Sequence, residues 1–312
     1  MKMRIFTVAS DSRLADLAVL LESASRETNQ PIHVIPFDGS IQLTRKLCEL
    51  YGAVICEPRD VWDNIGRHCF GISAHQERGS DVQTWRYFRK FNAISASNGE
   101  PFVFVDANSA ILYKPEHFFS SNHEQIVFGH FSKPRRNFSL FGQFLIKQIG
   151  PDRLRNKGYG AGFWFVPPNL LRTSMFEELL QYQDVTTLLG TAPEQSVLNL
   201  IIALHGIKTC LIREYNQDFE YLMVSANSDQ QESLVYNDGA WSRFSQGKKI
   251  SSQHLLAIKW TGNYHQGAFS FPQKEIHRMF VDGVLSRCSD SDKTLSNALI
   301  RHYSGVYGHQ FM

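Results

Sequence analysis

The stretch PFVFVDANS, residues 101–109, decides the expected fold. Its apolar part, Pro101–Val105, is a near-continuous hydrophobic run, which is typical of a strand buried on both faces at the centre of a parallel sheet. The run ends in Asp106-Ala107-Asn108. Ligands of open α/β sheets bind at the carboxyl ends of the strands. The sequence therefore predicts a polar binding element where a central strand ends.

Three earlier runs of β-forming residues supply neighbours for this strand. Helical patterns separate them, so strand and helix alternate along the N-terminal part of the chain. This alternation is the signature of a parallel sheet with right-handed crossovers. The expected strands are Arg4–Ala9, Ile32–Phe37 and Ala53–Cys56, and the expected helices begin near Leu14 and span Ile41–Tyr51.

The first two of these strands also end in polar residues. Ala9-Ser10-Asp11 closes the first strand, and Asp38 follows the second. Because the carboxyl ends of parallel strands share one edge of the sheet, we expect these residues to converge with Asp106. An aspartate in such a place is equally typical of a turn or a helix cap, and both interpretations stay open for Asp11 and Asp38.

The remainder of the chain is less regular. Residues 57–81 read as loops, and the chain beyond Asn216 reads as short strands before a final helix. No repeat, low-complexity tract or linker interrupts the sequence, which favours one domain over residues 1–312. The other expected elements are helices at Thr84–Ser97, Asn169–Tyr182, Glu194–Leu204 and Asp292–Tyr303, strands at Gly162–Val166 and Lys208–Ile212, and an amphipathic segment at Phe138–Ile149.

Composition excludes several classes of protein. The formal net charge is +2, and no basic run is interleaved with aromatic residues, so nucleic acid is not an expected partner. The five cysteines are scattered, which indicates neither a zinc site nor a disulfide framework. The N-terminus reads as a strand and not as a signal peptide, and no apolar run is long enough to span a membrane. We therefore expect a cytoplasmic protein with reduced thiols.

Four short segments carry a more specific signal through their order and spacing. They are Arg4–Asp11, Trp85–Lys90 leading into Phe102–Asn108, Gly158–Phe165 and Pro193–Asn199, with a weaker fifth at Lys259–His265. In this order they resemble the GT-A glycosyltransferases, especially the family of glycogenin and the bacterial lipopolysaccharide galactosyltransferases. The resemblance extends over most of the chain, although each segment alone is short and degenerate.

The resemblance implies a fold and a reaction. It implies a GT-A-like α/β domain with a mostly parallel central sheet flanked by helices and a less regular C-terminal half. Residues 1–110 would form the nucleotide-binding half, and residues 111–312 the acceptor half with a C-terminal extension. The reaction would transfer a sugar from a nucleotide-diphosphate sugar to a glycan or a lipid-linked saccharide. A UDP-sugar is the family's common donor.

The residues that match the family's motifs are the candidate substrate-binding residues. The glycines among them would allow the backbone to approach the donor closely. The candidates are Ala9, Ser10, Asp11, Asp38, Arg86, Lys90, Asp106, Ala107, Asn108, Gly160, Ala161, Gly162, Lys259, Gly262 and His265.

The candidate diphosphate site departs from the family pattern at two positions. Asn108 stands where a second carboxylate is expected, and Lys259 where a metal-binding histidine is expected. Three interpretations stay open. Asp106 and Asn108, helped by Ser109 or His265, would hold Mn²⁺ or Mg²⁺. Alternatively, the cations of Lys259, Arg86 and Lys90 would stabilise the leaving diphosphate without a metal. In the third, the site binds but does not catalyse.

Glu194 and Gln195 are the candidate catalytic residues. In a retaining reaction the leaving phosphate accepts the acceptor proton, and Gln195 would support the oxocarbenium-like state. In an inverting reaction a carboxylate base is required, and Glu194 would supply it. The plain alternative is that Pro193-Glu194 merely starts a helix, since proline and acidic residues both favour a first turn.

Residues 133–157 carry a second feature. Basic residues dominate this stretch, and an apolar stripe from Phe138 to Ile149 runs through it at helical spacing. Such a segment could lie peripherally on an anionic membrane, where a lipid-linked acceptor would be found. Packing of the stripe in the core, with the basic residues in solvent, is the commoner arrangement and the one we favour.

Other enzyme classes lack their motifs. The sequence has no dinucleotide-binding glycine motif, P-loop or nucleophile elbow. A non-catalytic sugar-nucleotide-binding protein of the same fold is the main alternative. A nucleotidyltransferase is a weaker one, because the loop after the first strand lacks glycines. The dispersed histidines, His123, His130, His205 and His302, read as structural or surface residues.

Overall fold

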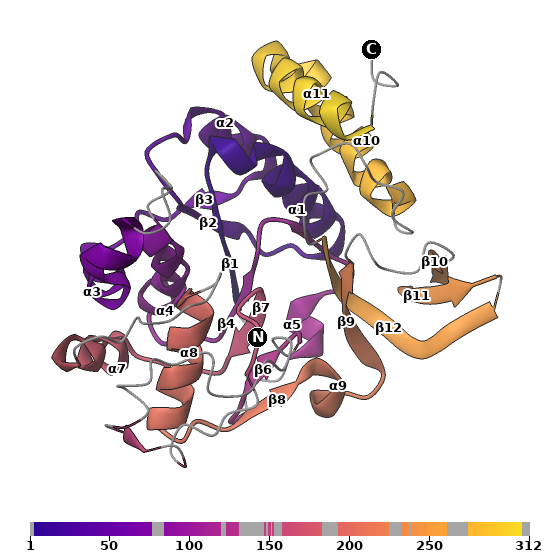
Figure 1. The fold of residues 1–312 in the computed structure, drawn as a ribbon. Helices are drawn as coiled ribbons and strands as arrows, with labels where there is room; N and C mark the ends of the chain where they lie inside the picture. Colours follow the sequence, from indigo (N-terminus) through magenta and orange to yellow (C-terminus); the bar gives the residue numbers. More distant parts are fainter. Residues whose placement is uncertain are drawn as a thin grey trace.

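The structure is a computed structural model of the chain. It describes residues 3–76, 84–119, 123–130, 147, 149–150, 152, 158–182, 193–224, 232–237, 239–246, 248–260 and 274–307. Within these residues the chain forms two sheets and helices that pack against them (Figure 1).

The larger sheet has seven strands in the order β3-β2-β1-β4-β7-β6-β8. All run in one direction except β7, which is antiparallel to both of its neighbours. The predicted mostly parallel central sheet is therefore confirmed. Its strands are β1 (Arg4–Ala9), β2 (Ile32–Pro36), β3 (Val54–Ile55), β4 (Phe102–Val105), β6 (Ile126–Phe128), β7 (Phe163–Val166) and β8 (Thr209–Leu211).

The central strands bury both faces because their side chains alternate between two hydrophobic cores. In β4, Val103 and Val105 belong to one core, and Phe102 and Phe104 to the other. All four residues of β4 are buried. The apolar run at 102–105 thus forms the doubly covered strand that the sequence predicts.

Helices cover the two faces of this sheet (Figure 1). One face carries α1 (Leu14–Glu27) and α2 (Gln42–Tyr51). The other carries the larger group of helices and 3₁₀ turns, whose apolar residues make up the second core. These are α3 (Asp60–Gln76), η2 (Thr84–Phe91), α4 (Asn92–Ser97), α7 (Thr173–Glu177), η3 (Glu178–Gln181) and α8 (Pro193–Leu204).

A second sheet of five strands forms from the middle and C-terminal parts of the chain. Its order is β10-β11-β12-β5, and β9 also pairs with β12. Strand β5 begins three residues after Asp106, so the Asp106-Ala107-Asn108 segment connects the two sheets. The strands are β5 (Ser109–Ile111), β9 (Phe219–Val224), β10 (Glu232–Asn237), β11 (Ala240–Ser245) and β12 (Lys248–Trp260).

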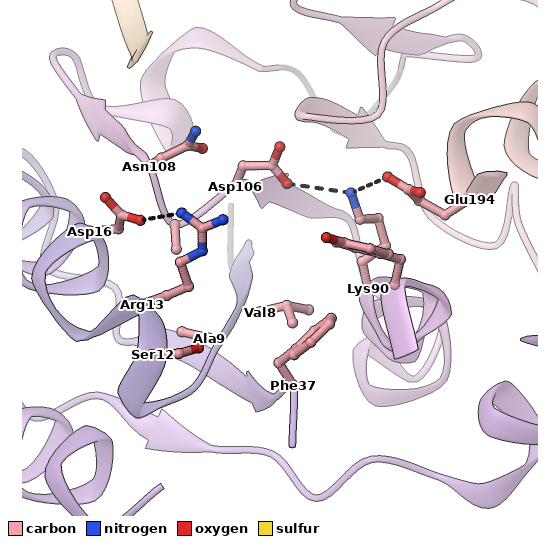
Figure 2. Close-up of a pocket in the computed structure, with 12 residues that line it drawn as sticks. Val8, Ala9, Ser12, Arg13, Asp16, Phe37, Lys90, Asp106, Asn108 and Glu194 are labelled. Carbon is pink, nitrogen blue, oxygen red and sulfur yellow. Dashed lines mark hydrogen bonds and ion pairs between the residues drawn. The ribbon is translucent and has the colours of Figure 1, made fainter. Parts of the chain in front are cut away.

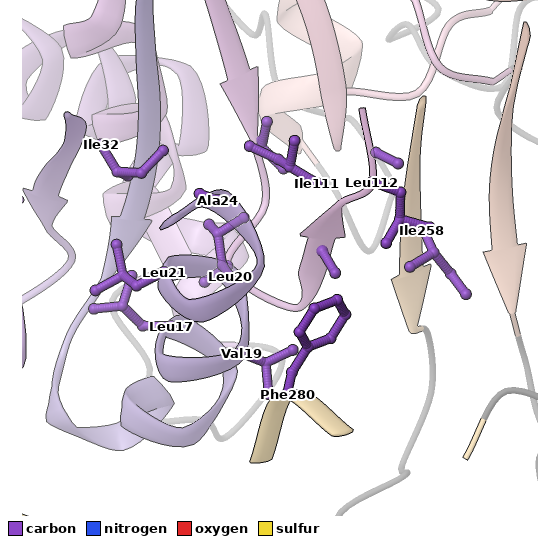
Figure 3. Close-up of a cluster of buried hydrophobic side chains, with 14 of the residues drawn as sticks. Leu17, Val19, Leu20, Leu21, Ala24, Ile32, Ile111, Leu112, Ile258 and Phe280 are labelled. Atoms are coloured by element: carbon purple, nitrogen blue, oxygen red, sulfur yellow. The ribbon is translucent and has the colours of Figure 1, made fainter. Parts of the chain in front are cut away.

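Two C-terminal helices, α10 (Lys274–Ser291) and α11 (Lys293–Tyr307), pack against α1. Figure 3 shows Phe280 of α10 beside Val19 of α1, with Ile258 of β12 and Ile111 of β5 in the same apolar cluster. The Tyr303 hydroxyl donates to the Ala15 carbonyl at 2.9 Å. Short elements complete the fold: η1 (Asp11–Arg13), α5 (Pro115–Phe118) and α9 (Ile212–Tyr215).

Several predicted elements need correction. The stretch 57–81 contains the helix α3, whose Trp62, Ile65 and Cys69 are fully buried. The expected helix over Thr84–Ser97 is divided between η2 and α4. The helix expected from Asn169 begins at Thr173, because Asn169 has a left-handed backbone, with φ of 58°. Residues beyond 216 include the long strand β12 and the helix α10, neither of which was predicted.

None of the helices within the described ranges combines the length and the apolar character that crossing a bilayer would require.

Candidate functional site

A cavity of about 390 Å³ opens at the carboxyl ends of β1, β2 and β4 (Figure 2). This is the edge where strand-end residues were expected to converge. Residues from β1, η1, α1, η2, the segment after β4, and α8 line it. They are Val8, Ala9, Ser12, Arg13, Asp16, Phe37, Tyr87, Lys90, Asp106, Ala107, Asn108 and Glu194.

The floor of the cavity is a chain of charged groups. Lys90 Nζ lies between two carboxylates, 3.0 Å from Glu194 Oε1 and 3.4 Å from Asp106 Oδ1 (Figure 2). Lys90 comes from η2, Asp106 from the end of β4 and Glu194 from the first turn of α8. The structure thus joins three residues that the sequence proposed from two of its four segments.

Lys259 binds the other oxygen of Asp106. Its Nζ donates to Asp106 Oδ2. Pairing of β12 with β5 places Lys259 opposite Ser109, which puts the lysine beside the turn that carries Asp106. Each oxygen of the Asp106 carboxylate therefore accepts from a different lysine.

These contacts control protonation in the cluster. Burial by itself raises the pKa of Asp106, but Lys259 and Lys90 outweigh it and hold the pKa of this carboxyl below its ordinary value. Burial likewise lowers the pKa of Lys90, and Asp106 and Glu194 outweigh that effect and raise it. Asp106 is therefore a carboxylate and Lys90 an ammonium at neutral pH.

Asn108 locks the segment after β4 to the end of β12. Its Nδ2 donates to the Trp260 carbonyl at 2.6 Å, and Trp260 N donates to the Asn108 carbonyl at 3.0 Å. The amide nitrogen of Asn108 is thus used in the structure, while the residue still lines the cavity. A structural role for Asn108 was not predicted.

The glycine-rich segment predicted beside the donor sugar packs against the same cluster. The Gly162 carbonyl accepts from Asp106 N at 2.8 Å, and the Ala161 carbonyl lies 3.5 Å from Lys90 Nζ. A Cβ atom at Gly162 would lie 2.6 Å from Lys259 Nζ. The absence of a side chain at residue 162 therefore leaves space for the Lys259 ammonium.

Gly160 leaves space for a histidine that the sequence did not suggest as part of the site. A Cβ atom at Gly160 would lie 2.2 Å from His130 Nε2. The His130 ring stacks on the Tyr221 ring, with 5.6 Å between the ring centroids. Burial, and then Lys259, lower the pKa of His130 to about 4, whereas Asp106 opposes this shift. His130 is accordingly a neutral imidazole at neutral pH, packed behind the charged cluster.

The cavity lining also includes two aromatic side chains. Phe37, directly after β2, and Tyr87 of η2 lie with ring centroids 5.3 Å apart. On the α1 side, Arg13 Nη1 lies 3.3 Å from Asp16 Oδ2 (Figure 2). The sequence did not identify these four residues, although Phe37 lies at a predicted strand end beside Asp38.

Some predicted site residues have other roles. The Asp11 carboxylate accepts from Thr44 N and Thr44 Oγ1, both at 2.8 Å, at the start of α2, which is the helix-cap interpretation. Asp38 accepts from Ser40 N at 2.8 Å within its own turn. Neither aspartate lines the cavity.

Seven further predicted residues also lie outside the cavity lining. Four of them pack around Asp106 and His130 as described above, namely Gly160, Ala161, Gly162 and Lys259. The other three lie elsewhere. Ser10 is fully buried behind the cavity lining and lies 3.0 Å from Ser12, Oγ to Oγ. Arg86 lies over the Trp85 ring, 5.2 Å from its centroid. Gln195 follows Glu194 on α8, and its carbonyl accepts from Asn199 Nδ2 at 2.7 Å.

Other predicted features lie outside the described residues. These are Gly262, His265 and, apart from residues 147, 149, 150 and 152, the basic stretch 133–157.

The residues present do not fit a divalent metal site built on Asp106. Mn²⁺ and Mg²⁺ need several oxygen ligands, and an ammonium offers none. Both oxygens of Asp106 accept from lysines, and the Asn108 amide is tied to Trp260 by its nitrogen. Within the described part of the chain, no three His, Cys, Asp or Glu residues are grouped as metal ligands would be.

No protein-family model matches the sequence, and neither does any curated protein. Solved structures do match. The bifunctional glycosyltransferase WbbM, in its apo form, is similar over 96% of this chain and 51% of its own length, at 11% identity and a TM-score of 0.53. The galactosyltransferase LgtC, in complex with donor and acceptor sugar analogs, matches over 91% of this chain and 96% of its own, at 14% identity and a TM-score of 0.48.

GlyE of Streptococcus pneumoniae TIGR4, also a glycosyltransferase, matches over 97% of this chain and 64% of its own, at 10% identity and a TM-score of 0.47. At such identities a structural likeness defines the fold, and the reaction must be argued from the site. With its mostly parallel sheet flanked by helices and its likeness to WbbM, this chain has the fold of the GT-A-type glycosyltransferases.

Proposed function

We propose that this protein transfers a sugar from a nucleotide-diphosphate sugar to a saccharide, free or lipid-linked. The observation that carries the proposal is the cluster of Lys90, Asp106, Lys259 and Glu194. Lys90, Asp106 and Glu194 line a cavity at the carboxyl ends of parallel strands, and Lys259 contacts Asp106 beside it, in a chain with a glycosyltransferase fold. Paired lysines and carboxylates at one point suit a substrate that carries both a diphosphate and sugar hydroxyls.

The cavity lining offers two chemically different kinds of group. The aromatic side chains of Phe37 and Tyr87 suit the flat base of a nucleotide, which stacks on such rings. The lysines of the cluster suit the diphosphate. With the diphosphate at the lysines, the donor sugar would lie near Asp106 and Glu194. UDP-sugars are the donors that we test first, because they are the common choice in the family that the sequence resembles.

Glu194 has the chemistry for the acceptor side of the reaction. During transfer, the bond from the anomeric carbon to the β-phosphate oxygen breaks, and its electron pair leaves with the nucleoside diphosphate. The acceptor oxygen bonds to the anomeric carbon and loses its proton. Glu194 Oε1 accepts from Lys90, and Oε2 is buried without a hydrogen-bond partner among the described residues. In an inverting reaction Oε2 takes that proton, whereas in a retaining reaction the leaving phosphate does so.

A non-catalytic sugar-nucleotide-binding protein is the second candidate. The same ion pairs favour it. Asp106 and Glu194 already have cationic partners, so both carboxylates have a structural role that needs no part in catalysis. Binding without turnover would identify it. A nucleotidyltransferase remains a weaker alternative.

Incubation with a panel of nucleotide sugars, followed by an assay for released nucleoside diphosphate, tests the proposal. Water serves as acceptor when no saccharide is added. We expect one donor to raise the melting temperature and to be turned over. If the reaction is inverting, Glu194→Gln should lower turnover by about 100-fold, the usual scale for loss of a proton-transferring group, and should change donor affinity little.

Glu177→Gln is the matched control, because Glu177 is exposed on α7, away from the cavity lining. It should retain wild-type turnover. If no nucleotide sugar stabilises the protein or is turned over, the proposed function is wrong. Stabilisation without turnover in any donor–acceptor combination would instead assign the non-catalytic function.

A further inference from the structure

Cations built into the protein already occupy the position on Asp106 where a metal-dependent site would hold its ion. The ammonium of Lys259 contacts Oδ2, and that of Lys90 lies 3.4 Å from Oδ1. A divalent ion at this carboxylate would have to displace a lysine and would then lie close to two positive charges in a half-buried site. The charge arrangement therefore opposes a metal and favours an anion.

The position of Lys259 is fixed by the fold. Its backbone is paired on both sides, with Ser109 of β5 and Met223 of β9. The next residue, Trp260, is bonded to the Asn108 side chain. The ammonium lies in the space above Gly162 that a Cβ atom would fill. A cation held in this way needs little reorganisation to meet a diphosphate.

The Lys259 ammonium also has N–H groups that the described residues do not use. An ammonium has three N–H groups. Asp106 is the hydrogen-bond partner that the described residues provide for it, which leaves two N–H groups for a ligand. The side chain is 15% exposed. Lys90, by contrast, divides its donors among Asp106, Glu194 and the Ala161 carbonyl.

We infer that Lys259 replaces the divalent cation, binding the donor diphosphate directly, so that the protein binds its nucleotide without Mn²⁺ or Mg²⁺. The inference rests on the proposed function and specifies how that site recognises its substrate. Asp106 then acts as a positioning residue, holding the ammonium where the phosphates arrive.

Calorimetric titration of the whole chain with UDP, with GDP and ADP in parallel, tests this. Each titration is run in excess chelator and again in excess Mn²⁺. We expect the dissociation constant of the tightest nucleotide to agree within about threefold between the two conditions. Binding that weakens by about tenfold or more in chelator would overturn the inference and leave the proposed function standing.

Lys259→Met supplies the second readout, because it removes the charge and keeps most of the side-chain length. It should weaken nucleoside diphosphate binding by about tenfold or more, the scale expected for loss of a charge-assisted contact. Affinity for the corresponding nucleoside, which has no phosphate, should not change. Lys249→Met is the control, because Lys249 is an exposed lysine on the same strand.

The outcomes are distinguishable. Unchanged diphosphate affinity in Lys259→Met contradicts the inference, whereas nucleoside binding by the same variant shows that it is folded. If Lys259→Met does not fold, the comparison of chelator with Mn²⁺ in the wild type decides. If the wild type binds neither nucleoside nor diphosphate in either condition, the proposed function and this inference both fail.

Discussion

Behind the charged cluster there is no room for a side chain at residue 160 beside the His130 ring. The backbone of Gly160 donates to the His130 carbonyl at 3.0 Å, and the His130 ring fills the space where a side chain would begin. That ring stacks in turn on Tyr221. A side chain at residue 160 and the His130 ring therefore exclude one another.

This exclusion gives a prediction at the residue scale. Gly160→Ala should lower the free energy of unfolding by about 1–3 kcal/mol, the usual cost of overpacking. Adding the same change to His130→Ala should cost clearly less, because the ring has been removed. Urea unfolding of the four proteins in this double-mutant cycle measures the coupling. Equal costs in the two backgrounds would show that His130 is not the obstacle.

Individual site residues differ in how far the sequence could predict them. Asp106, Lys90 and Glu194 were predicted, because each belongs to a short segment whose position in the fold is set locally. Arg13 and Tyr87 carry no such signal, since a charged first turn and an aromatic helix residue are common in any surface helix. His130 could not have been predicted, because only tertiary packing brings it to Gly160.

At the scale of elements, Asp11 ties the start of α2 to the loop after β1. Its carboxylate accepts from Thr44 N and, more weakly, from Leu43 N at 3.3 Å. Both are first-turn amides that have no acceptor within the helix itself. An aspartate distant in sequence thus provides the cap that Ile41, next to the helix, cannot provide.

The cap interpretation gives a prediction that separates it from donor binding. Asp11→Ala should lower the free energy of unfolding by about 0.5–2 kcal/mol, the usual effect of losing a helix cap. Asp11→Asn, which keeps an acceptor oxygen, should lose less. Nucleotide affinity should be unchanged in both variants. A large loss of affinity at wild-type stability would return Asp11 to the substrate-binding residues.

Helices and strands were predictable where their apolar residues recur at the regular spacing that places them on one face. The strands β1, β2 and β4 and the helices α1, α2 and α8 fall close to their expected positions. Asp292 caps α11 through Thr294 N and Leu295 N, which places that helix where its capping residue indicates. Helix α3 was missed although Trp62, Ile65 and Cys69 have helical spacing, because polar residues separate them.

At the scale of the whole molecule, the site forms where the two sheets meet. Asp106 directly follows β4 of the larger sheet, and Lys259 comes from β12 of the smaller one. Helix α10 is joined to α1 by Arg287, whose Nε lies 3.0 Å from the buried Glu22 carboxylate. The single-domain organisation over 1–312, with a nucleotide half and an acceptor half, stays a prediction. These contacts between distant parts of the chain support it.

The sequence could not predict the second sheet as a unit. Strand β12 starts among lysines and serines and becomes apolar only near its end, so its pattern resembles several short strands. Its pairing with β5 joins residues separated by nearly half the chain and depends on contacts that no local window contains. The role of Lys259 follows from that pairing, which explains why its direct contact with Asp106 was not predicted.

A crystal structure of the protein with bound UDP is the most direct test of the central claim that the cavity around Asp106 binds a nucleotide diphosphate. We predict the base against Phe37 and Tyr87, and a phosphate oxygen within hydrogen-bond distance of Lys259 Nζ. UDP bound elsewhere, for example in the surface pocket lined by His123, Arg172 and Lys208, would contradict the claim, and so would a bound diphosphate that makes no contact with Lys259.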